Sequence, residues 1–214
     1  MNYEARRQAI LDEMEENSIL ILYSGEALHR NADAYYPFEE NKHFFYLTGL
    51  RRENMALVMK KVDGSCATFL YIERADPNAE RWTGKMVTAE EAKAISGIQD
   101  VRFTERFDAQ MQYLLNGSDI RVCYFDCHRN QLGDLPDYNL AKARQFAADF
   151  PGISIRNLWR MVTKLRMQKD ADEVEKISQA IDVTRQGLEE VLSTLKPGMK
   201  EYQAQANYEH VLYY

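Results

Sequence analysis

Residues 55–72 read MALVMKKVDGSCATFLYI, and this stretch says most about the fold. Two apolar runs, Met55 to Val62 and Cys66 to Ile72, flank the tripeptide Asp63-Gly64-Ser65. An Asp-Gly turn between two runs of strand-forming residues is the strongest short-range signal for a β-hairpin. The stretch therefore predicts two neighbouring antiparallel strands in the middle of the chain.

The upstream sequence predicts a helix and two further strands. Residues 3–16 place apolar side chains on one stripe among charged neighbours, which is typical of an amphipathic helix. Ser18 to Tyr23 is a continuous apolar run that ends at Ser24-Gly25, and this pattern suits a strand buried on both faces. A polar loop is expected over residues 26–41. The aromatic run from His43 to Gly49 predicts a second strand.

Downstream of the hairpin, helices alternate with strands. Thr88 followed by Glu91 forms a capping box that predicts a helix start. The remaining expected elements are a helix over Phe107 to Leu115, a strand over Ile120 to Asp126, a helix over Asn139 to Phe150 and a short strand over Ile153 to Arg156. This order predicts the α/β class, with a mixed β-sheet flanked by helices.

The C-terminal quarter has a different pattern. Asp170 and Glu173 resemble a capping box. They precede a long helix with one apolar seam at Val174, Ile177, Ile181, Thr184, Leu188, Val191 and Leu195. A seam of about three heptads favours docking on a neighbouring domain over a coiled coil. Lys196-Pro197-Gly198 ends this helix, and residues 200–214 begin another one without a stop signal.

Composition and charge exclude several classes of protein. The 214 residues include 45% hydrophobic ones and carry a net charge of −6, from 27 basic and 33 acidic side chains. This balance offers no electrostatic footprint for nucleic acid or for an anionic membrane. No segment approaches about 18 consecutive apolar residues, and no apolar signal sequence follows the first residues. Three cysteines, an odd number, fit a reducing compartment, so the cytoplasm is expected.

Cys123, Cys127 and His128 form a C-x-x-x-C-H pattern that could suggest a metal site. A second ligand pair at zinc-site spacing is missing, and Cys66 is distant in the sequence. Cysteine is also among the residues most often buried in protein interiors. Structural thiols are therefore the preferred interpretation.

Four stretches carry more specific information. Residues 30–49 read RNADAYYPFEENKHFFYLTG, and residues 80–84 read ERWTG. Residues 165–170 read LRMQKD, and residues 196–201 read KPGMKE. In order and spacing, these stretches closely resemble motifs of the aminopeptidase P family. The first two match its N-terminal domain, and the last two match the start of its "pita-bread" catalytic domain.

The resemblance implies an N-terminal domain over residues 1–160, followed over residues 161–214 by the linker and first helices of an incomplete catalytic domain. In the family, the N-terminal domain helps to wall the substrate cleft. Carried onto the matching positions, Asp33 and Trp82 are implied to lie near the substrate. From the residues alone, Asp33 could simply organise a turn. Trp82, in an expected polar loop, could serve as a contact surface or in packing.

The resemblance also implies a metal-dependent Xaa-Pro aminopeptidase that releases an N-terminal residue preceding proline. Family members use two divalent metal ions, usually manganese, held by two aspartates, one histidine and two glutamates downstream of the P-G-M-x-E motif. This chain ends at Tyr214, 13 residues after Glu201. We therefore expect no catalytic residue and no metal ligand in this chain, and no activity from it alone. No H-E-x-x-H, G-x-S-x-G or P-loop motif offers a substitute.

Two alternatives stay open. Prolidase, which cleaves Xaa-Pro dipeptides, shares the two-domain plan. A non-catalytic binding module of the same fold is the other alternative. The resemblance implies proline-containing peptides as the ligands of the intact enzyme and a homodimer or higher oligomer as its assembly. The unpartnered seam from Val174 to Leu195 leads us to expect self-association or packing against residues 1–160.

Overall fold

The predicted hairpin lies inside a six-stranded sheet in the computed structural model, which describes residues 2–129 and 131–214. Strand β4 (Ala56–Val62) pairs antiparallel with β5 (Ser65–Ile72), and Val62 stands opposite Ser65 at the turn. Asp63 and Gly64 both have positive φ angles, 51° and 69°. Two consecutive left-handed residues give the turn a twist that matches the strands. The hairpin prediction is confirmed.

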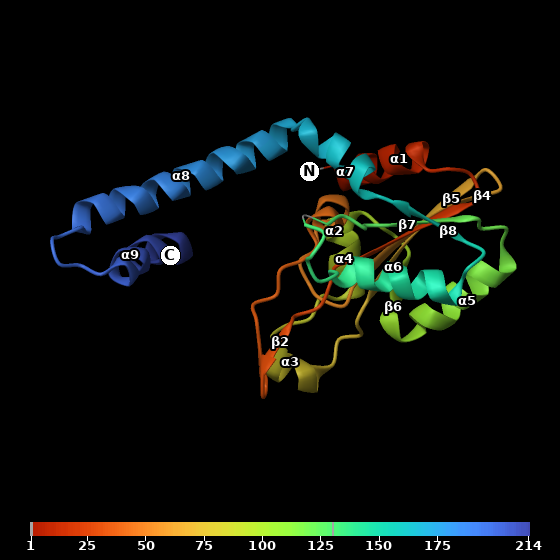
Figure 1. Ribbon diagram of the computed structural model, residues 1–214, viewed down its shortest axis with the longest axis horizontal. Coiled ribbons are helices and arrows are strands. Elements are labelled where there is room, and N and C mark those ends of the chain that lie inside the picture. Colours follow the sequence, from red (N-terminus) through yellow and green to blue (C-terminus); the bar gives the residue numbers. More distant parts are fainter. Residues whose placement is uncertain (1, 130) are drawn as a thin grey trace. The chain divides into compact units, whose positions relative to one another are not determined.

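The strands follow the order β6-β5-β4-β1-β7-β8 (Figure 1). The other four are β1 (Ser18–Tyr23), β6 (Val101–Phe103), β7 (Val122–Phe125) and β8 (Ser154–Asn157). Strand β1 is antiparallel to β4 and parallel to β7, while β5–β6 and β7–β8 are parallel pairs. The sheet is therefore mixed, and the predicted α/β class is confirmed.

Helices cover both faces of this sheet. One core contains buried side chains of α1 (Tyr3–Glu13), α2 (Lys42–Thr48), α4 (Ala89–Ser96) and α7 (Trp159–Met167). The other core contains those of α5 (Phe107–Gly117) and α6 (Tyr138–Asp149). In β1, Leu20 and Leu22 enter the first core and Ile19 and Ile21 the second. Successive strand residues point to opposite faces, so an unbroken apolar run is what a doubly covered strand requires.

The expected strand from His43 to Gly49 is wrong, because this segment forms helix α2. The Asn41 side chain accepts hydrogen bonds from the backbone amides of His43 and Phe44, both at 2.9 Å. Gly49 closes the helix in the left-handed conformation at φ 76°. The preference of aromatic residues for strands is weak, so helix caps and the burial of side chains decide between strand and helix in such a segment. Here five of the seven helical side chains are buried.

Smaller differences concern loops and unpredicted elements. The polar loop expected over residues 26–41 contains a two-stranded ribbon, β2 (His29–Asn31) with β3 (Ala34–Tyr35). The loop expected around Trp82 is helix α3 (Pro77–Thr83), capped by Asp76. Strand β6, helix α7 and a 3₁₀ turn (Thr104–Arg106) were not expected either. These pieces are short, so periodicity has too few residues in which to appear.

The chain divides into two compact units, Asn2–Leu165 and Arg166–Tyr214. The second consists of α8 (Ala171–Thr194) and α9 (Glu201–Tyr213), and the Asp170–Glu173 capping box begins α8 as predicted. Gly187 lets the two helices approach closely, because a Cβ there would stand 2.6 Å from the Tyr208 ring. Asn207 Nδ2 also donates to Thr194 Oγ1 at 2.8 Å.

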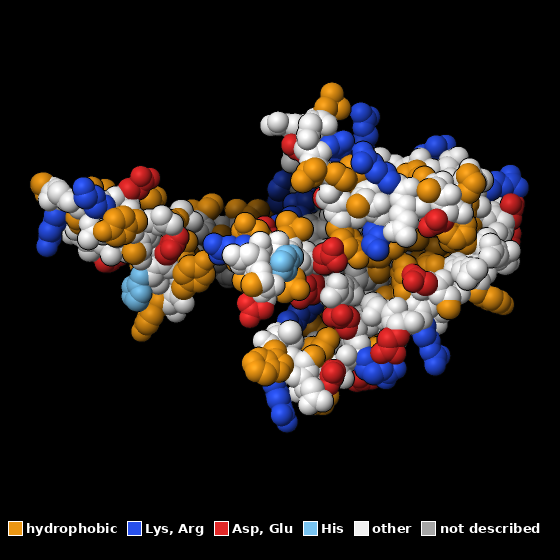
Figure 2. All heavy atoms as spheres, turned by 60° about the horizontal axis from the view of Figure 1, so that its bottom comes forward, with side chains coloured by type: hydrophobic (Ala, Val, Ile, Leu, Met, Phe, Trp, Pro, Cys, Tyr) orange, Lys and Arg blue, Asp and Glu red, His pale blue; other side chains and the backbone are white. Residues whose placement is uncertain are grey.

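Much of the apolar seam of α8 faces solvent. Its exposed fractions range from 46% to 62% at Val174, Ile177, Ile181, Leu188 and Leu195. Figure 2 shows hydrophobic side chains at the surface of this unit. Over the described residues, no helix is both long and apolar enough to span a membrane.

Candidate functional site

The two longest connecting segments of the first unit leave the sheet at the same edge. Strands β1 and β5 are each antiparallel to β4, so both end at the same edge. Residues 24–41 leave this edge after β1 and contain the β2–β3 ribbon; residues 73–88 leave it after β5 and contain α3. Ligands of open α/β sheets commonly bind outside the carboxyl ends of strands. This edge of the sheet is therefore the candidate position for a ligand site.

Hydrogen bonds join the starts of these two connecting segments. Ser24 and Met55 exchange bonds: the Ser24 amide donates to Met55 O at 2.9 Å, and the Met55 amide donates to Ser24 Oγ at 3.0 Å. The Asn54 amide donates to Gly25 O at 2.9 Å, and its side chain donates to Glu73 Oε1 at 3.2 Å. Asn54 thus links the segment after β1 to the segment after β5.

Asp33 lies in the turn of the β2–β3 ribbon, with its side chain exposed. Ala32, beside it, has a positive φ of 47°, and its carbonyl oxygen lies 2.8 Å from His29 Nε2. The His29 ring also meets the Tyr35 ring edge-on, with centroids 5.4 Å apart. These contacts hold the turn and leave the Asp33 carboxylate without a hydrogen-bond or ion-pair partner among the described residues.

Trp82 lies on helix α3, and its side chain is 91% exposed. A packing role within the first unit is therefore excluded. The short helix is held at both ends: Asp76 accepts from the Asn78 amide at 2.9 Å, and the Gly84 amide donates to Glu80 O at 3.0 Å. A large indole presented to solvent on a capped helix is typical of a contact surface. Within residues 2–129 and 131–214, no hydrogen bond or ring contact joins Trp82 to Asp33.

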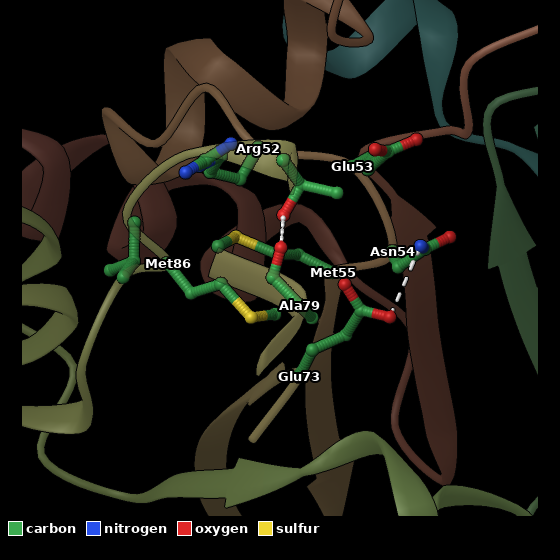
Figure 3. Close-up of a pocket in the computed structure, with 9 residues that line it drawn as sticks. Arg52, Glu53, Asn54, Met55, Glu73, Ala79 and Met86 are labelled. Atoms are coloured by element: carbon green, nitrogen blue, oxygen red, sulfur yellow. Dashed lines mark hydrogen bonds between the residues drawn. The ribbon is translucent and has the colours of Figure 1, made fainter. Parts of the chain in front are cut away.

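A hollow of about 230 Å³ lies beside α3 (Figure 3). Its apolar lining comes from Met55, Ala79, Met86 and Val87. The Glu73 carboxylate, which accepts from Asn54, adds a negative group to the wall. The hollow thus combines apolar and charged groups beside the helix that presents Trp82.

A buried pair of polar side chains, His43 and Asp126, supports the same edge from within. His43 Nδ1 lies 3.0 Å from Asp126 Oδ2, and the two residues are only 6% and 5% exposed. Asn41 Nδ2 donates to the same oxygen at 3.0 Å. Burial alone would raise the pKa of Asp126, but the hydrogen bond and charge of His43 and the Asn41 amide outweigh it, so this pKa lies below its ordinary value.

No local pattern in the sequence predicts this pair, because Asp126 lies 83 positions after His43. The pair fixes Asn41, the residue that caps α2, against the end of β7. Its role in the structure is therefore to position elements at the edge.

The described residues contain no group of three or more His, Cys, Asp or Glu side chains that could hold a metal ion. Cys123 is buried, and burial raises the pKa of its thiol well above the ordinary value. Burial likewise raises the pKa of Cys127 to about 11. The His128 ring stacks on Trp159, with centroids 4.2 Å apart. Cys123 is thus a buried thiol, as the sequence predicts, while Cys127 is half-buried and Cys66 is exposed.

Comparisons with known proteins agree with this fold. The family model "Aminopeptidase P, N-terminal domain" matches residues 3–124. The chain is 26% identical to the Xaa-Pro aminopeptidases of Haemophilus influenzae and Escherichia coli, over 97% of its own length in each case. A solved structure of a candidate aminopeptidase P from Bacillus anthracis is 33% identical, with a TM-score of 0.92 over 99% of the chain.

The match is limited to part of each relative. This chain covers 46% of the H. influenzae protein, 48% of the E. coli protein and 50% of the B. anthracis chain. It spans about half the length of the relatives that it matches.

Proposed function

Since the chain belongs to the family of aminopeptidase P N-terminal domains, we propose that it is the N-terminal portion of a metal-dependent Xaa-Pro aminopeptidase. Such an enzyme hydrolyses the bond between an N-terminal residue and a following proline. The proposal rests on the family match over residues 3–124 together with relatives named for this activity. We assign residues 1–160 to the N-terminal domain and residues 161–214 to the start of the catalytic domain.

The chemistry is proposed to lie outside this chain. Two divalent ions, manganese by family resemblance, would activate water and stabilise the tetrahedral oxyanion in the intact enzyme. One relative of known structure, from E. coli, is described as zinc-substituted. The described residues do not fit such a centre, because they bring together no metal-binding group. We propose that the metal ligands belong to the rest of the intact enzyme. We also propose the cytoplasm as the compartment of this protein.

Asp33 and Trp82 are proposed as substrate-proximal residues of the intact enzyme. Two observations support this: both side chains are exposed, and both lie on connecting segments that leave the sheet at the same edge. Exposing an indole leaves apolar surface in water, so a ligand or partner that covers it gains binding free energy. The flat face of the ring suits the apolar ring of proline.

The test of this role uses the full-length protein. We expect Trp82→Ala to lower kcat/KM for an Xaa-Pro-Yaa tripeptide with Mn²⁺ about tenfold, which corresponds to about 1.4 kcal/mol of binding to the transition state. Asp33→Asn should also lower it. Tyr113→Ala on α5 is the matched control, because it removes another exposed aromatic ring, 83% exposed, and should leave kcat/KM unchanged. Equal kcat/KM in all variants would refute the role of Asp33 and Trp82.

The same assay separates the alternatives. Activity of the full-length protein on tripeptides, with none from residues 1–214 alone, supports the proposal. Cleavage restricted to Xaa-Pro dipeptides would indicate a prolidase instead. If the full-length protein is folded but cleaves no peptide, it is a non-catalytic binding module. Turnover by residues 1–214 alone would place the metal site within this chain.

Self-association is proposed through the exposed seam of α8. Five apolar side chains along one face of this helix are half-exposed, and water-exposed apolar stripes of this kind drive association. We expect sedimentation of residues 1–214 to depend on concentration, with a dimer at tens of micromolar. Ile181→Lys with Leu188→Lys should give a monomer. Gln186→Lys, on the other face of α8, should leave the association unchanged; a wild-type monomer over the whole range would refute the proposal.

A further inference from the structure

A second hollow, of about 390 Å³, opens at the same edge of the sheet, where helices α5 and α6 begin. Its walls come from the end of β1, the start of β4, the segments after β5 and β6, and the first turns of the two helices. A volume of this size falls within the range of small-molecule sites. Neither Asp33 nor Trp82 lines it.

Three aromatic rings form one wall. The Tyr23 ring lies 5.8 Å from the Phe107 ring and 5.5 Å from the Tyr138 ring, measured between centroids. The buried Asn139 side chain fixes the Tyr23 backbone, because it accepts from the Tyr23 amide at 2.9 Å and donates to the Tyr23 carbonyl at 3.0 Å. The backbone that carries the central ring of the wall is therefore in place before any ligand binds, which lowers the entropic cost of binding.

Charged groups of both signs line the hollow without neutralising one another. Lys142 Nζ lies 5.2 Å from the centre of the Tyr138 ring and has no carboxylate within 4.0 Å among the described residues. Asp108 also has no cationic partner in residues 2–129 and 131–214. The Glu73 carboxylate meets only the neutral amide of Asn54. An ammonium and two carboxylates thus remain open to a ligand.

From this arrangement we infer that the hollow binds a small zwitterion, namely a free α-amino acid with an apolar side chain. Its carboxylate would pair with Lys142 and its ammonium group with Glu73 or Asp108. Its side chain would pack on the Tyr23, Phe107 and Tyr138 rings. A plain anion fits poorly, because two carboxylates stand against one ammonium. A purely apolar ligand would leave the half-buried Lys142 and Glu73 without partners.

The inference is independent of the proposed peptidase activity, since it needs no metal and no residue assigned to the substrate. The probe is L-leucine, added to residues 1–214 and followed by titration calorimetry. L-leucinamide, which lacks the carboxylate, and N-acetyl-L-leucine, which lacks the ammonium charge, are the comparators. We expect leucine to bind at least tenfold more tightly than either comparator.

Three variants assign the charges. Lys142→Gln should weaken leucine until it binds no better than leucinamide. Glu73→Gln keeps an oxygen that can accept from Asn54, so the edge should stay folded, and leucine should then bind no better than its N-acetyl form; Asp108→Asn tests the second carboxylate in the same way.

Arg144→Gln is the matched control, because Arg144 is an exposed cation on the same helix and lies outside the hollow. It should leave leucine binding unchanged. Equal affinity for all three probes, no leucine binding at millimolar concentration, or equal weakening in the Lys142 and Arg144 variants would overturn the inference. Peptidase activity of the full-length protein decides a separate question, so failure of one leaves the other standing.

Discussion

Replacing Gly49 by alanine is expected to lower the free energy of unfolding by roughly 2–5 kcal/mol. Gly49 ends α2 with a φ of 76°, and an L-residue in that left-handed region costs about 1–2 kcal/mol. An added Cβ would also stand 2.6 Å from the Tyr3 ring, and overpacking of this kind costs about 1–3 kcal/mol. The measurement is urea unfolding of residues 1–214, followed by circular dichroism.

Gly97→Ala is the matched control for this prediction. Gly97 ends α4 at a φ of 74°, almost the same conformation, but a Cβ there would lie 3.7 Å from its nearest neighbour. Only the cost of the left-handed backbone conformation should remain, so the free energy of unfolding is expected to fall by about 1–2 kcal/mol. In a Tyr3→Ala background, the cost of Gly49→Ala should fall toward this value. Equal costs at Gly49 and Gly97 in the wild-type background would show that the Tyr3 ring moves away freely.

Replacing Asp126 by alanine is expected to cost about 3–5 kcal/mol, because it leaves buried polar groups unpaired. Asp126 Oδ2 lies 3.0 Å from His43 Nδ1 and accepts from Asn41 Nδ2 at the same distance. Both of these residues belong to the start of α2, so the change should loosen that helix. Asp119→Ala is the control, since its ion pair with Arg121 is exposed and screened by solvent, so this change should leave the free energy of unfolding nearly unchanged.

The pH dependence of the free energy of unfolding tests the pair of Asp126 and His43 independently. The pKa of Asp126 is lowered in the folded state. Its contribution is therefore complete above the unfolded pKa of about 3.9 and is lost as the pH falls through the lower folded value. The stability difference between wild type and Asp126→Ala should shrink below about pH 4. A difference that stays constant from pH 7 to pH 3 would contradict the role of the ionised carboxylate.

Local patterns predicted the elements whose signals are complete within a few residues. The Asp63-Gly64 turn, the run from Ser18 to Tyr23 and the Thr88–Glu91 capping box each carry their own physical cause. The segment from His43 to Gly49 shows the limit. Its aromatic residues suggested a strand, whereas the caps at Asn41 and Gly49 and burial on the sheet made it a helix.

The candidate site was predicted only in part. Asp33 and Trp82 came from family resemblance, whereas the departure of both their segments from one edge of the sheet depends on the antiparallel placement of β4 between β1 and β5. The pairing of His43 with Asp126 and the hollow with Tyr23, Glu73 and Lys142 join residues far apart in the chain. No short-range pattern encodes such contacts.

The sequence by itself determined the α/β class, the central hairpin, the long C-terminal helix and the family, because periodicity, turn chemistry and motifs are local properties of the chain. Only the tertiary structure decided that residues 42–48 are helical, that Trp82 is exposed and that charges of both signs meet in one hollow. These outcomes depend on strand order and burial, which arise when distant segments pack together and compete with local preference.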